Sequence, residues 1–201
     1  MADVIIIGDG PAGLSAALFL AKNGQNVIVF GLDKTSMHYA MLYNYLGVPE
    51  ITGSDFQKVA REQVQKFGAV IRAEEVSTIE PSRTGFTVTT SSGENYEGKY
   101  LILAEGKALK LAKSLELPTT DAGVEVDRNY RTSIAGLYVI GRSTRIQRSQ
   151  AIISAGSGAV NSIRRSGSEG WVKARRIAWR NGRSRRWTGR RCAGIWRRTP
   201  P

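Results

Sequence analysis

The clearest chemical signal lies near the start of the chain, in the segment Gly8-Asp9-Gly10-Pro11-Ala12-Gly13. In this G-x-G-x-x-G pattern the first glycine permits a tight turn, and the second lets a pyrophosphate approach the backbone. The third lets a helix pack closely on a strand. The phosphate charge would meet N–H groups at the start of that helix. The pattern predicts dinucleotide binding, and a glycine-rich turn without a ligand is the alternative.

A second signal is an acidic residue after the next apolar segment. Asp33 lies 20 residues beyond Gly13, the distance at which the fingerprint places a carboxylate on the adenosine ribose. A carboxylate there favours a free 2′-hydroxyl over a 2′-phosphate. The alternative is that Asp33 is an ordinary turn residue.

The apolar pattern indicates the elements that must position these residues. A β-branched run at Asp3–Ile7, a helical pattern at Ala12–Asn23 and an apolar run at Val27–Phe30 together form a βαβ unit. A second helix is expected from Ser54, whose hydroxyl would form a capping box with Gln57.

The rest of the chain adds strands and one helix. The expected elements are an antiparallel β-meander over Val76–Ile79, Phe86–Thr90 and the stretch around Tyr96, buried strands at Tyr100–Ala104 and Leu137–Ile140, and a helix at Gln150–Ile163. The predicted fold class is α/β: a Rossmann-like three-layer domain with a parallel sheet and a small antiparallel β-meander.

Charge divides the chain in two. Residues 1–163 carry 16 Lys and Arg against 16 Asp and Glu, whereas residues 164–201 carry 13 against one. We therefore expect one domain over residues 1–163 and a basic Arg- and Trp-rich tail over residues 164–201. The tail is either disordered, not native sequence, or a segment that binds nucleic acid or anionic lipid.

Composition excludes several classes of protein. The single cysteine, Cys192, excludes an intrachain disulfide, a CxxC redox pair and a cysteine-based zinc site. Apolar runs are too short for a transmembrane helix, and no secretory leader is evident. We expect a cytoplasmic protein without a membrane segment and without a metal site.

The order of the motifs resembles the flavin domain of the thioredoxin reductase family, within the pyridine-nucleotide disulfide oxidoreductases. Residues 3–34 are similar to that family's FAD-binding βαβ unit. Leu101–Gly106, Gly136–Gly141 and Gln150–Gly158 are similar to its A-T-G strand end, its second flavin motif and the start of its last helix. The resemblance covers about residues 3–160 and implies FAD as the cofactor, with NAD(P)H binding transiently as electron donor or not at all.

The resemblance also implies where an extended FAD would lie. The diphosphate would lie at Gly10–Gly13, the adenosine ribose near Asp33 and the ribityl chain near Arg142, with the flavin ring at the start of the last helix. The cofactor-binding residues expected on this basis are Gly8, Gly10, Pro11, Ala12, Gly13, Phe30, Gly31, Asp33, Lys34, Ala104, Glu105, Gly106, Gly141, Arg142, Gln150 and Ala151. No catalytic residue is identified.

Departures from the family pattern affect the expected function. The interval Lys107–Ala135, where the family has its pyridine-nucleotide domain, is too short for a second βαβ fold, and the CxxC pair of that domain is missing. Glu105 replaces the family's Thr, and Arg142 replaces its Asp. Arg142 can only donate hydrogen bonds, so it pairs either with the FAD diphosphate or with Glu105.

The leading hypothesis is a FAD-dependent oxidoreductase, a thioredoxin reductase-like single-domain flavoprotein. It would pass electrons between FAD and an unidentified partner protein or small molecule. One alternative is a non-enzymatic FAD- or NAD(P)-binding redox sensor or subunit, and another is a nucleic-acid binder acting through the basic tail. The oligomeric state, a homodimer included, is left open.

Overall fold

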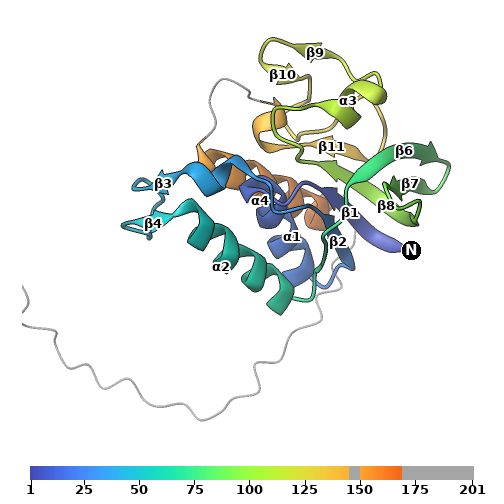
Figure 1. The fold of residues 1–201 in the computed structure, drawn as a ribbon. Coiled ribbons are helices and arrows are strands. Elements are labelled where there is room, and N and C mark those ends of the chain that lie inside the picture. The colour runs from blue at the N-terminus through green and yellow to red at the C-terminus, as the bar shows by residue number, and fades with distance from the viewer. Residues whose placement is uncertain (145–149, 169–201) are drawn as a thin grey trace, which may run out of the picture.

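A computed structural model of the chain describes residues 1–144 and 150–168 (Figure 1). The helices are α1 (Pro11–Lys22), α2 (Gly53–Lys66), α3 (Lys110–Ser114) and α4 (Ala151–Ser168), with the 3-10 turns η1 (Ser36–Tyr39) and η2 (Gly141–Thr144). The strands are β1 (Ala2–Ile7), β2 (Val27–Phe30), β3 (Met41–Leu42), β4 (Ile51–Thr52), β5 (Val70–Arg72), β6 (Val76–Ser82), β7 (Gly85–Thr90), β8 (Asn95–Leu103), β9 (Thr119–Thr120), β10 (Gly123–Val124) and β11 (Leu137–Val139). The predicted basic tail lies, from residue 169 on, outside the described residues. None of the described helices is long and apolar enough to cross a membrane.

The main sheet has a parallel part and an antiparallel extension, and β8 belongs to both. The strand order is β5-β2-β1-β8-β7-β6, with β11 also paired to β8. Leu101–Leu103 of β8 pair in parallel with β1 and β11, whereas Asn95–Gly98 pair antiparallel with β7. The strands expected separately around Tyr96 and at Tyr100–Ala104 are therefore one continuous strand. Gly98 lies at the join, where an added Cβ would stand 2.8 Å from Ile5 Cγ1.

Two apolar clusters lie on opposite faces of the sheet, because successive side chains of a strand point to opposite faces. On β1, Ile5 and Ile7 belong to one cluster, and Val4 and Ile6 belong to the other. The first cluster is covered by the β6–β7 hairpin and α3. The second is covered by α1. Figure 1 shows α1, α2 and α4 gathered on one side of the sheet, which gives the three layers that the sequence predicts.

Helices α1 and α4 pack closely because α4 is rich in small residues. A Cβ added at Gly158 would overlap the backbone carbonyl oxygen of Ala12. Helix α4 continues to Ser168, five residues beyond the end predicted at Ile163. The prediction of the helix end was wrong because no proline follows Ile163, and the two arginines that come next are good helix formers.

The start of α2 also differs from the prediction. Thr52 is the N-cap, and its hydroxyl accepts a hydrogen bond from the Asp55 N–H at 3.1 Å. The predicted capping box is wrong, because the Ser54 hydroxyl bonds instead to Nδ1 of His38 at 3.0 Å. The side chain of Gln57 is fully buried and donates to the backbone carbonyl of Asp9. Helix α2 is thereby attached to the glycine-rich loop.

An ion pair fixes the outer end of β1. The Asp3 carboxylate accepts hydrogen bonds from the Asn26 N–H at 3.0 Å and from Lys99 Nζ at 2.9 Å. Burial alone would raise the pKa of Asp3, but these two hydrogen bonds and the Lys99 charge outweigh it. The pKa of Asp3 therefore lies below its ordinary value of 3.8.

Candidate dinucleotide-binding site

The glycine-rich loop joins β1 to α1 and has the geometry that its residues predict. Gly8 has a φ of +108°, and an added Cβ would overlap the carbonyl oxygen of Ala104. A Cβ added at Gly13 would overlap the carbonyl oxygen of Gly8. Gly10 differs, because its Cβ would approach only Thr35 Oγ1, at 3.5 Å. The other two glycines are needed for packing, whereas Gly10 borders open space at the start of α1.

A cavity of about 690 Å³ lies at the carboxyl ends of the parallel strands, where Ile7, Phe30 and Ala104 contribute to its wall. This edge is where open α/β sheets bind their ligands. Every predicted cofactor-binding residue lines the cavity except Gly13, Asp33 and Gly141. Segments that are far apart in the sequence therefore meet at one site.

Gly13 and Gly141 do not line the cavity, but their lack of a side chain allows the segments that form its wall to pack closely. Gly141 has a φ of +68°, and an added Cβ would stand 2.6 Å from the Cβ of Ala12. Its N–H donates to the Ser157 hydroxyl at 2.9 Å. These contacts hold η2 against the start of α1 and the first turns of α4. A larger residue at position 141 would push Arg142 away from the glycine-rich loop.

Asp33 is placed differently from the other predicted residues. It adopts a left-handed conformation with a φ of +58°, and its carboxylate lies 3.1 Å from Nε2 of His38. Its side chain is 43% exposed and does not line the cavity. Contact between Asp33 and an adenosine ribose stays a prediction.

Glu105 and Arg142 both line the cavity but do not pair with each other in the described part of the chain. The Glu105 carboxylate accepts the N–H groups of Leu111 at 3.0 Å and Ala112 at 2.8 Å, so it caps α3. The alternative in which Arg142 pairs with Glu105 is thus wrong. Nε of Arg142 is buried without a hydrogen-bond partner among the described residues. A cation in this state favours an anion in the cavity.

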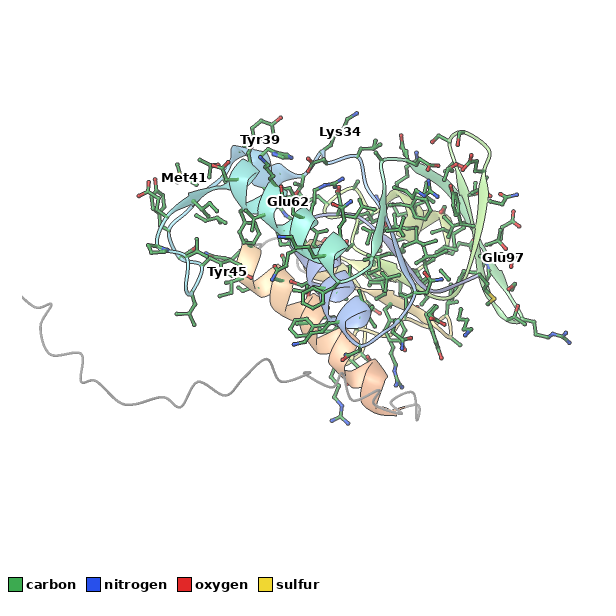
Figure 2. The ribbon with its side chains drawn as sticks, turned by 90° about the horizontal axis from the view of Figure 1, so that it is seen from below. Lys34, Tyr39, Met41, Tyr45, Glu62 and Glu97 are labelled. Carbon is green, nitrogen blue, oxygen red and sulfur yellow. The ribbon has the colours of Figure 1, made fainter. Side chains whose placement is uncertain are left out.

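The start of α4 forms another part of the cavity wall. The backbone carbonyl of Gln150 accepts the Ser154 N–H at 3.0 Å, and its side-chain oxygen accepts Nδ2 of Asn44 at 2.6 Å. This contact joins α4 to the arm formed by η1, β3 and β4. Tyr45 follows Asn44, and Figure 2 shows it at this end of the arm. Ala151 and Ser154 line the cavity beside Gln150.

The sequence analysis did not identify three further parts of the wall. They are η1 with its preceding residue, the junction of β5 and β6, and the stretch from Lys107 into α3. The lining residues missed in these parts are Thr35, Ser36, Met37, Glu74, Glu75, Val76, Lys107, Ala108, Lys110 and Leu111. The part that follows β5 could have been predicted, because β5 is parallel to β2 and the residues after it must therefore emerge at the same edge of the sheet. Among the described residues no group of three or more His, Cys, Asp or Glu could hold a metal ion.

Comparison with known proteins gives a family match. A family model described as pyridine nucleotide-disulphide oxidoreductase matches residues 2–111 and 47–170. The bifunctional thioredoxin reductase/thioredoxin of Mycobacterium leprae is 35% identical over 114 residues, which cover 54% of this chain and 24% of the relative. The ferredoxin–NADP reductase of Levilactobacillus brevis is 31% identical over 128 residues, which cover 60% of this chain and 38% of the relative. The chain thus matches well under half the length of either relative.

Solved structures show the same fold. The atypical thioredoxin reductase of Desulfovibrio vulgaris Hildenborough aligns with a TM-score of 0.75 and 18% identity, covering 82% of this chain and 96% of that one. The thioredoxin reductase of Streptococcus pyogenes aligns with a TM-score of 0.76 and 17% identity, covering 81% and 96%. The family and the fold class predicted from the sequence are confirmed.

Proposed function

The chain belongs to the pyridine nucleotide-disulphide oxidoreductase family, and on that premise we propose that it binds FAD in the cavity and acts as a FAD-dependent oxidoreductase. It would pass electrons between FAD and a partner protein or a small molecule. The observation that carries the proposal is that one cavity contains the glycine-rich loop, the strand end at Ala104–Gly106, Arg142 and the start of α4. In the sequence these segments are more than 130 residues apart at the extremes.

The residues present fit an extended dinucleotide. The open space beside Gly10 admits a diphosphate to the first N–H groups of α1, which have no acceptor within the helix. Arg142 supplies a cation whose buried Nε has no partner in the described part of the chain. The amino end of α4 lines the same cavity.

These positions indicate which role the cofactor and the protein residues would each have. Bound FAD would supply the electron-transfer chemistry. The start of α1 and Arg142 would hold the diphosphate, and the amino end of α4 would favour negative charge on the nearest edge of the ring. The hydrogen bond from Asn44 fixes the Gln150 side chain at this end. None of the groups that line the cavity is assigned as a proton donor.

The electron donor and acceptor are predictions from the sequence: NAD(P)H as a transient donor and a redox partner protein as acceptor. A homodimeric assembly and a cytoplasmic location are also predictions. Contact with nucleic acid would involve the basic tail, which lies largely outside the described residues.

The test is to purify the full chain without added cofactor and record its absorbance spectrum. A flavin spectrum, with FAD identified by mass after release, supports the proposal. A colourless protein that also fails to bind added FAD refutes it. The Gly10→Val variant, whose side chain would block the diphosphate, is the matched control and should purify with less flavin.

A second measurement separates the enzyme from the non-enzymatic sensor. NADH or NADPH is added without oxygen, and dithionite serves as the positive control for reduction. Bleaching of the flavin by a nicotinamide supports an oxidoreductase with that donor. Bleaching by dithionite alone favours the sensor.

A further inference from the structure

The end of β2 lacks the acidic side chain that usually binds the adenosine ribose. Strand β2 ends at Phe30, so residue 31 is the first residue at the carboxyl edge, where dinucleotide-binding folds place that acid. Residue 31 is glycine, and its position lines the cavity. A Cβ added there would overlap the carboxyl carbon of Asp9. The side chain of Asp9, from the glycine-rich loop, therefore occupies the space that a side chain of residue 31 would fill.

Asp9 is buried and paired with a cation. The residue is only 5% exposed, and its Oδ2 forms an ion pair with Arg61 of α2. The same oxygen accepts the Asp33 N–H at 3.0 Å. The amide of Gln57 donates to the Asp9 carbonyl. Burying a carboxylate is costly unless a cation pairs with it, and Arg61 is that cation.

One oxygen of Asp9 is left for a ligand. The donors to the Asp9 carboxylate in the described part of the chain, the Asp33 N–H and Arg61, both bond to Oδ2, and Asp9 lines the cavity next to Gly10. Asp33, in contrast, faces His38, is 43% exposed and lies outside the cavity wall. Of Asp9 and Asp33, only Asp9 lines the cavity in which a bound adenosine would lie.

We propose that Asp9 binds the hydroxyl groups of the adenosine ribose, and that Arg61 and Gln57 are positioning residues for it. The proposal rests on the proposed function, since it requires an adenine dinucleotide in the cavity. It also sets the ligand class. A fixed carboxylate accepts hydrogen bonds from free ribose hydroxyls and repels a 2′-phosphate. The site thus selects dinucleotides with an unmodified adenosine ribose, such as FAD.

The test compares two probes: FAD, and its analogue in which the adenosine carries no 2′- or 3′-hydroxyl. Affinities are measured by flavin fluorescence on the full chain after its cofactor has been removed. A hydrogen bond between a hydroxyl and a carboxylate should favour FAD over the analogue by roughly tenfold to hundredfold in the wild-type protein. Asp9→Asn keeps the shape of the side chain and should reduce this preference to near one. Asp33→Asn is the matched control and should keep it.

Two further variants guard against a folding defect. Asp9→Asn leaves Arg61 without its partner, so the double variant with Arg61→Gln removes both charges and should also lose the preference. Arg61→Gln alone keeps the carboxylate but removes the group that positions it, so it should reduce the preference, although less than Asp9→Asn does. Melting temperatures of all variants are recorded in parallel.

The outcomes separate the two proposals. The role of Asp9 is overturned if Asp9→Asn weakens the binding of FAD and of the analogue equally. It is also overturned if the preference is lost in Asp33→Asn alone. In either case the proposal that the chain binds FAD still stands. A wild-type chain that binds neither probe overturns the proposed function, and with it this inference. Loss of the preference in the Asp9 variants, with binding of the analogue retained, supports the role of Asp9.

Discussion

Replacing Gly10 with alanine should separate nucleotide binding from folding. Gly10 is the N-cap of α1 with a φ of −75°, a conformation open to any residue, and its added Cβ would touch only Thr35 Oγ1 at 3.5 Å. Alanine is a poorer N-cap than glycine, which costs about 0.5–1 kcal/mol in the free energy of unfolding. For a chain of this size the melting temperature should fall by roughly 1–4 °C.

The same methyl group should weaken FAD binding far more. It would stand in the open space beside the first N–H groups of α1, which the diphosphate must approach closely. A hydrogen bond to a charged group contributes about 1.5–3 kcal/mol. Loss of one such bond raises the dissociation constant of FAD roughly tenfold to hundredfold. The predicted effect on binding thus exceeds the predicted effect on stability.

The assay titrates FAD into protein stripped of its cofactor and follows flavin fluorescence, with the melting temperature measured separately. Gly24→Ala is the matched control. Gly24 has a φ of +80° with nothing within 4 Å of its added Cβ, so alanine there costs about 1–2 kcal/mol of backbone strain far from the cavity. This variant should melt at a lower temperature and bind FAD like the wild type. Wild-type affinity in Gly10→Ala would refute the placement of the diphosphate at α1.

Three other substitutions and one truncation test the remaining contacts and the basic tail. Arg142→Gln should weaken FAD binding about tenfold with little change in melting temperature, because its guanidinium is unpaired among the described residues; unchanged affinity would exclude contact with the diphosphate. Glu105→Ala should lower the free energy of unfolding by about 1 kcal/mol, measured by urea unfolding, because α3 loses its cap. Asp3→Asn should destabilise the fold by less than about 1 kcal/mol at neutral pH. Because the folded pKa of Asp3 lies below 3.8, this difference should vanish as the pH falls through the folded value, and a constant difference would contradict the ion pair. A chain ending at Ser168 should keep its FAD and lose most salt-dependent DNA binding, because residues 1–168 carry 18 Lys and Arg against 16 Asp and Glu.

The parallel core could be predicted from the sequence because its signals are local. The β-branched run of β1, the glycine-rich turn and the apolar run of β2 each specify their own conformation. The helix expected at Ala12–Asn23 is α1 at Pro11–Lys22. Close packing at Gly8 and Gly13 follows from the lack of a side chain, which is a property of the residue itself.

Elsewhere, local signals were equivocal and tertiary contacts decided between them. Thr52 and Ser54 are both good N-cap residues, and the contact of Ser54 with His38 leaves Thr52 as the cap. The stretch around Tyr96 and the strand at Tyr100–Ala104 were predicted as separate strands, yet both belong to β8, with Gly98 between them. There its missing side chain makes room for Ile5 of the neighbouring strand. Neither contact is visible in the sequence pattern around the residue concerned.

The assignment of acids to the site illustrates the limit of spacing arguments most directly. Spacing gives the place of Asp33 along the chain but not the direction of its side chain, and a φ of +58° together with His38 turns the carboxylate away from the cavity. Glu105 lies where expected, but the N–H groups of α3 take its carboxylate. In both cases a nearby donor determines where the charge points. Asp9 was not among the predicted binding residues, and the role proposed for it depends on the absence of a side chain at Gly31, which lies 22 residues away in the sequence. Because β1 and β2 are adjacent parallel strands, the residues that follow them share one edge of the sheet. When a sequence matches the G-x-G-x-x-G pattern, the acid that binds the ribose should therefore be sought after the first strand as well as after the second.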